Sequence, residues 1–257
     1  MTILVLAAVF FLGPQVSALR YSFVQSNGEN GLGNYTQLFH DSALGSSLVT
    51  SLEIAALTTV IMLALMLPTV VWVRLRLPRL AVVVESISVL PIVIPPIVMA
   101  AGLATLQSHA SAQISSVIFT SPLTALTPFY VILAMPFAFR SLDVGVRAID
   151  LRTLVDAARN LGAGWTTLLL RVILPNVRTA ILTAASLTVA LVLAEVVISE
   201  TLLYDTYPVE LVNTGQNLVG VAVALSVLSL AVTWLLLYMV SFIGNRDASR
   251  ARIGRLL

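Results

Sequence analysis

Three glutamates that interrupt long apolar runs are the residues of this chain best placed to do chemistry. Ionisable groups inside such runs are costly and are candidates for a transport pathway: Glu53, Glu85 and Glu195. Glu53 and Glu195 lie near the ends of their runs, so solvation or packing there is an alternative role for either. Glu85 follows Arg79 by six residues, which favours a lipid-headgroup contact or a local ion pair.

Several other kinds of chemistry are excluded by composition. The chain has no cysteine, so it forms no disulfide and has no thiolate ligand or cysteine nucleophile. His40 and His109 lie far apart in sequence, which makes no case for a metal site. All 14 basic residues are arginine, so no lysine completes a G-x-x-x-x-G-K-[ST] phosphate loop. We expect no catalytic residue, metal or cofactor here, and any ATP would be bound by another subunit.

The overall composition indicates a membrane protein. Of 257 residues, 58% are hydrophobic and 10% are charged, whereas soluble domains carry about 25% charged residues. The apolar runs reach the roughly 20 residues that a bilayer-spanning helix needs, and none alternates as a barrel strand would. We predict an all-α polytopic membrane protein with about six transmembrane helices. The runs cover residues 2–19, 47–73, 80–106, 123–139, 179–199 and 218–243.

Arginine placement predicts how these helices are oriented, because short loops rich in basic residues stay cytoplasmic. Thirteen of the 14 arginines lie in the segments that follow the second, fourth and sixth runs, and these three segments are therefore predicted to be cytoplasmic. Only Arg20 lies outside them. We therefore expect a multi-pass protein of the cell (inner or plasma) membrane with both termini cytoplasmic. The predicted parts are a first helix at 1–19, an external loop at 20–46, a core at 47–245 with a cytoplasmic loop at 140–178, and a cytoplasmic tail at 246–257.

The first run has a second interpretation as a secretory signal. Val16-Ser17-Ala18 resembles the small-residue cleavage site of a signal peptide, although no basic segment precedes the apolar run. Cleavage would leave the other five helices oriented as before. A start upstream of Met1 is a further alternative, because no cytoplasmic lead precedes the run.

The third run, "LPIVIPPIVMAAGL", is the most interrupted by proline. Pro91, Pro95 and Pro96 each remove an N–H donor, and unwound backbone in a membrane is tolerated only against protein or a water-filled cavity. We predict that this segment lines a pathway, with packing kinks as the alternative. Glu195 is the other pathway candidate, because it borders an acidic, arginine-free outer segment that suits a cationic solute.

The loop at 140–178 is too polar to be inserted and too regular to be disordered. Apolar residues recur at helical spacing along its first half: Leu151, Leu154, Val155, Ala158 and Leu161. Gly162 then stands where a helix C-cap requires positive φ, and "WTTLLLRVIL" begins a second short helix that ends near Pro175. Such a hairpin either rests on lipid headgroups or docks into a groove on a partner.

This segment resembles the EAA loop of the permeases of binding-protein-dependent ABC importers. The family pattern is E-A-A, three residues, G, nine residues and I-x-L-P. Here Asp156-Ala157-Ala158, Gly162 and Val172-Ile173-Leu174-Pro175 match its spacing, with Asp for Glu and Val for Ile. The resemblance extends over roughly residues 35–245, and the third and fifth runs look most like the spermidine/putrescine branch of the type I importers.

The resemblance implies a type I ABC importer permease fold with a cytoplasmic coupling helix. The chain would form half of a pathway for a small polar solute, paired with a second permease, identical or different, two copies of an ATPase that binds Mg-ATP, and an extracytoplasmic solute-binding protein. It implies no nucleic-acid partner. The apolar stripe and Gly162 would face the ATPase, and the coupling residues would be Leu154, Asp156, Ala157, Ala158, Leu161, Gly162, Leu174 and Pro175.

Two other functions compete with the importer. An intramembrane enzyme would need a nucleophile and base or a metal within the bilayer, and no histidine or cysteine lies in any apolar run. An ion-coupled secondary transporter would use the glutamates, but six helices lack its usual internal repeat. Only the importer accounts for the loop.

Overall fold

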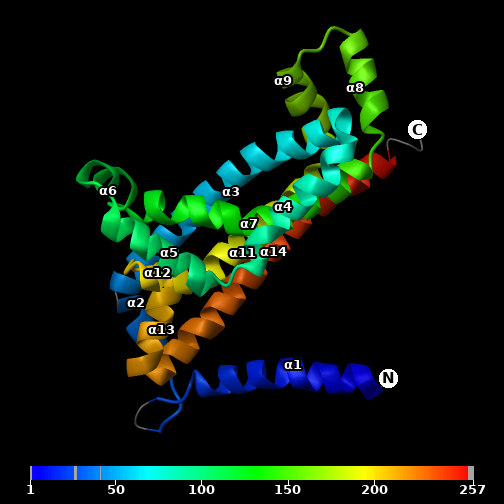
Figure 1. Ribbon diagram of the computed structural model, residues 1–257. Helices are drawn as coiled ribbons and strands as arrows, with labels where there is room; N and C mark the ends of the chain where they lie inside the picture. Colours follow the sequence, from blue (N-terminus) through cyan, green and yellow to red (C-terminus); the bar gives the residue numbers. More distant parts are fainter. Residues whose placement is uncertain (1, 26–27, 41, 254–257) are drawn as a thin grey trace.

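The computed structural model describes residues 2–25, 28–40 and 42–253, and over these ranges the chain is helical apart from turns and one isolated bridge between Val24 and Asn30. The long helices lie in a bundle, and α1 (Thr2–Tyr21) extends away from one end of it (Figure 1). The helical prediction is confirmed. Its physical basis is that a helix satisfies its own backbone hydrogen bonds without help from the surroundings.

Two helices are long and apolar enough to cross a membrane, α3 (Ser42–Arg76) and α7 (Pro122–Arg147). Two bent helix pairs raise the number to four if each pair is one span. Shorter described apolar segments lie in α1 and in α14 (Val219–Ile253). The structure is thus consistent with an α-helical membrane protein.

The third apolar run breaks where its prolines predicted. A short 3-10 turn, Pro78–Leu80, leads into α4 (Ala81–Val93), and α5 (Pro96–His109) departs from that direction by 84°. Ile94 is extended at the break because the proline that follows disfavours helical backbone there. Single prolines elsewhere, such as Pro68 in α3, lie within continuous helices.

Other helix limits differ from the predicted runs. The fourth run continues beyond 139 to Arg147, whereas α11 (Arg178–Ala194) ends five residues before the predicted limit of 199. The helix α14 continues to Ile253, through most of the segment predicted as a separate tail. Helices also lie between the predicted runs: α2 (Gly33–His40), α6 (Ala112–Ile118) and α13 (Tyr207–Asn217). A further short helix, α12 (Val197–Thr201), begins within the predicted fifth run.

The main apolar core is formed where α3, α7 and α11 pack together. Met62, Leu142 and Ala184 are fully buried there. Gly145 allows α7 to approach α11 closely, since an added Cβ would lie 2.3 Å from the Ala180 Cβ. The same core includes buried residues of the predicted hairpin, such as Val155 and Leu168.

Candidate functional site

The candidate site is the helical hairpin Leu151–Asn176, which projects from the end of the bundle (Figure 1). Its first arm, α8 (Leu151–Asn160), follows α7 after a short turn. Asp150 caps α8, because its carboxylate accepts hydrogen bonds from the backbone N–H (3.3 Å) and the hydroxyl (2.7 Å) of Thr153. These hydrogen bonds lower the pKa of Asp150 below its usual range, since they favour the ionised form.

Gly162 ends the first arm as predicted. Its φ is +78°, a left-handed conformation that glycine adopts without steric cost. The N–H of Gly162 donates to the carbonyl of Arg159 at 2.8 Å, and the N–H of Ala163 donates to the carbonyl of Ala158 at 3.0 Å. This pair of hydrogen bonds is a Schellman motif, which turns the chain sharply toward the second arm.

The second arm is one helical segment with a change of pitch. It comprises α9 (Trp165–Thr167), a π-helical turn at Leu168–Ile173 and α10 (Leu174–Asn176). Pro175 lies inside this segment rather than at its end. The arm makes an angle of 82° with α11, so the hairpin does not continue the direction of the following helix.

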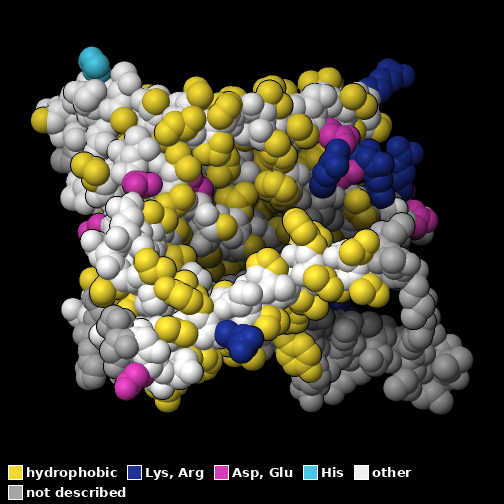
Figure 2. Space-filling view, turned by 90° about the horizontal axis from the view of Figure 1, so that it is seen from below, with side chains coloured by type: hydrophobic (Ala, Val, Ile, Leu, Met, Phe, Trp, Pro, Cys, Tyr) yellow, Lys and Arg dark blue, Asp and Glu magenta, His cyan; other side chains and the backbone are white. Residues whose placement is uncertain are grey.

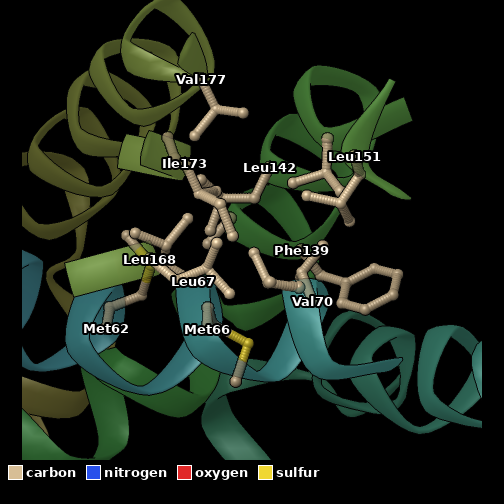
Figure 3. Packing of buried hydrophobic residues seen from close by; sticks show 14 of the residues in the cluster. Met62, Met66, Leu67, Val70, Phe139, Leu142, Leu151, Leu168, Ile173 and Val177 are labelled. Atoms are coloured by element: carbon tan, nitrogen blue, oxygen red, sulfur yellow. The ribbon is translucent and has the colours of Figure 1, made fainter. Parts of the chain in front are cut away.

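Three of the five residues of the first arm's apolar stripe are buried within the chain. Leu151, Val155 and Ala158 keep at most 8% exposure, and all three belong to the main core. Figure 3 shows Leu151 near Leu142 and Phe139 of α7, with Leu168 and Ile173 of the second arm on the other side of the cluster. The expectation that the stripe faces an ATPase is therefore wrong for these residues, including Ala158, because the second arm and the ends of α3 and α7 cover them.

The remaining predicted coupling residues lie on the accessible side of the hairpin. Leu154 is half-buried, and Leu161 at the tip is 89% exposed. The other exposed members of the predicted set are Asp156, Ala157, Gly162, Leu174 and Pro175. The first arm and tip thus present one acidic side chain, small residues and a protruding leucine, while Leu174 and Pro175 lie at the far end of the second arm.

The predicted pathway residues fall into two places. Pro91 is buried in α4, whereas Pro95 and Pro96 are exposed at the bend between α4 and α5. Glu195 lies at a second break, between α11 and α12, and is 8% exposed. The two places are next to each other in the fold, because α12, which follows Glu195, packs against α5, which begins at Pro96.

Glu195 has a structural environment that sequence alone did not predict. The hydroxyl of Tyr130 donates to its Oε2 at 2.9 Å, and the backbone N–H of Ile198 donates to both carboxylate oxygens, at 3.0 and 3.2 Å. Tyr130 is 65 residues away in sequence, so no local signal identified it. The carboxylate thereby accepts a hydrogen bond from a backbone N–H at the start of α12 that has no partner within that helix, and its hydrogen bond with Tyr130 connects this position to α7.

A second polar cluster joins α3 to α7 below the hairpin. Asp143, which is 5% exposed, accepts from the Nε of Arg74 at 2.5 Å and from the Nη2 of Arg147 at 2.7 Å. Asp143 and Arg147 are four residues apart in one helix, a spacing from which an ion pair can be predicted from sequence. Arg74 is 69 residues from Asp143, so the sequence gives no local signal for that pair. Over the described ranges, no three histidine, aspartate or glutamate residues lie close enough to hold a metal.

Comparison with models of known protein families finds no match for this chain, and a search of curated proteins finds none either. The class that the structure supports is an α-helical protein with helices long enough to span a membrane. Its distinguishing feature is the capped hairpin built onto the ends of α3 and α7.

Proposed function

We propose that this chain is the permease subunit of a type I ABC importer, in which the hairpin transmits ATPase movements to the membrane helices. The observation that carries the proposal is the two-sided hairpin. Its buried side belongs to the same core as α3, α7 and α11, and its other side exposes the remaining EAA-like residues. A helix-and-turn element held in this way can move the bundle when a partner moves it.

The roles within the loop differ from those expected at first. Leu151, Val155 and Ala158 connect the hairpin to the bundle, because their side chains pack into its core. Asp156, Ala157, Leu161 and Gly162 would contact the ATPase. Partner binding then depends on the tip and the acidic side chain rather than on the buried part of the apolar stripe.

The proposed assembly has a second permease, two ATPase copies that bind Mg-ATP, and an extracytoplasmic binding protein. The arginine distribution supports a cytoplasmic hairpin, and Figure 2 shows basic side chains gathered mainly at one end of the molecule. Both termini would then be cytoplasmic in the cell membrane. A small polar solute would pass between the permeases, and the exposed Glu200 and Asp205 of the proposed outer end favour a cation.

An ion-coupled secondary transporter is the second candidate, and Glu195 favours it. Broken helices next to a buried carboxylate are typical of ion sites in such transporters. In this structure, however, the carboxylate oxygens accept from Tyr130 and from the start of α12, which is also what a purely structural cap would do.

The test is co-purification with an ATPase encoded beside this gene, together with solute uptake by vesicles that contain the complex. Asp156→Lys should insert normally but lose the ATPase or its coupling. The double variant Thr166→Lys/Thr167→Lys is the charge-matched control, because both threonines are exposed on the second arm. ATPase binding and ATP-dependent uptake by Asp156→Lys at the wild-type level would count against Asp156 as a coupling contact, and uptake driven by an ion gradient without ATP would favour the second candidate.

A further inference from the structure

Arginine side chains line a shallow hollow at the base of the hairpin, where α3, α7 and α8 meet. The hollow has a volume of about 240 Å³. Its basic lining residues are Arg74, Arg147 and Arg152, and its one acidic lining residue is Asp150. The ion pairs with Asp143 involve Arg74 and Arg147, whereas Arg152 has no such partner within the described ranges.

The acidic groups nearby are already engaged. Both carboxylate oxygens of Asp143 accept from Arg74 and Arg147, and Asp150 directs its oxygens to Thr153 of its own helix. With both aspartates counted, these five side chains carry one net positive charge. The positive end of the α8 dipole lies at the same place, because α8 begins at Leu151.

Arg74, which lines the hollow, has one donor that lacks an acceptor within the described part of the chain. The Nη2 atom of Arg74 is buried and has no hydrogen-bond partner, although its Nε is bound to Asp143. A buried charged donor without an acceptor is costly, so such groups are normally satisfied. Arg152 lines the same hollow, is exposed, and forms no ion pair within the described ranges.

We propose that this hollow binds a phosphate group, held by Arg74, Arg147 and Arg152. Guanidinium groups bind phosphate oxygens through paired, charge-assisted hydrogen bonds, and three of them surround the space from three helices or helix ends. The phosphate would tie the end of α3 to the start of α8 and so stiffen the base of the hairpin. The same chemistry is offered by the headgroup of an anionic lipid and by a free phosphate.

The experiment measures binding to the full chain in detergent micelles by the shift in its melting temperature. The probes are inorganic phosphate, a short-chain phosphatidylglycerol and, as the zwitterionic reference, a short-chain phosphatidylcholine. A ligand that binds only the folded state raises the melting temperature with its concentration. A shift with phosphatidylglycerol beyond that with phosphatidylcholine supports the proposal with a lipid source, a shift with inorganic phosphate supports it with a soluble source, and no shift with either overturns it.

The variants distinguish this site from general charge attraction. Arg152→Gln should weaken binding by roughly tenfold or more, the effect of losing a charge-assisted hydrogen bond. Arg159→Gln is the matched control, since Arg159 is an exposed arginine of the same helix that does not line the hollow. Equal losses in the two variants, or wild-type binding by Arg152→Gln, would overturn the proposal. Neither result bears on whether an ATPase binds the tip, because the tip residues are unchanged.

Discussion

Replacing Gly162 by alanine should loosen the hairpin without any steric clash. The φ of Gly162 is +78°, and an added Cβ would meet nothing within 4 Å, so the cost comes from backbone conformation alone. For an alanine in the left-handed region that cost is about 1–2 kcal/mol. This conformational cost destabilises the turn that the Schellman hydrogen bonds of Gly162 and Ala163 form, which is the junction between the two arms.

The matched control is Gly164→Ala, only two residues further along. Gly164 has φ −74° and ψ 170°, which alanine adopts readily, and an added Cβ would again meet nothing within 4 Å. This variant should be neutral or more stable by about 0.4–1 kcal/mol, because alanine has fewer unfolded conformations to lose. The two substitutions add the same methyl group and differ in the backbone conformation that receives it.

Amide hydrogen exchange of the full chain in micelles measures the difference. A loss of 1–2 kcal/mol raises the population of the locally opened hairpin by about 5–30-fold, so the Ala163 amide should exchange faster by that factor in Gly162→Ala. Amides in the middle of α3 should be unaffected. Unchanged exchange at Ala163, or an equal increase in Gly164→Ala, would refute the argument that positive φ at Gly162 holds the turn.

Three further substitutions probe the polar groups around the hairpin. Asp143→Asn should lower the free energy of unfolding by about 3–5 kcal/mol in chemical denaturation, because it leaves the largely buried Arg74 without its counter-charge. Arg147→Gln should cost no more than about 1 kcal/mol, since that side chain is 55% exposed; equal costs would contradict the assignment. The Asp150 cap stabilises α8 fully above the ordinary aspartate pKa of 3.8, and this stabilisation should be lost as pH falls through the lowered folded-state pKa. Helix exchange measured against pH should show this acid loss in the wild type, whereas Asp150→Asn, which caps without titrating, should lack it.

The hairpin shows how far local sequence reasoning reaches. A glycine after an amphipathic segment is sufficient to predict a C-cap, because the left-handed conformation is a property of one residue and its neighbours. The structure confirmed it at Gly162. The direction of the apolar stripe was predicted incorrectly, because periodicity shows that Leu151, Val155 and Ala158 share a face but does not show what covers that face.

Local sequence features were sufficient to predict that this chain is helical, apolar enough to span a membrane and interrupted within its proline-rich third run. These properties follow from runs of apolar residues and from the backbone preferences of glycine and proline, all of which act within a few residues. The contacts of Tyr130 with Glu195 and of Arg74 with Asp143, and the packing of Leu168 and Ile173 in one core with the hairpin stripe, became known from the three-dimensional structure. Such contacts depend on the relative placement of whole helices, which many long-range packing interactions set together and no single segment encodes.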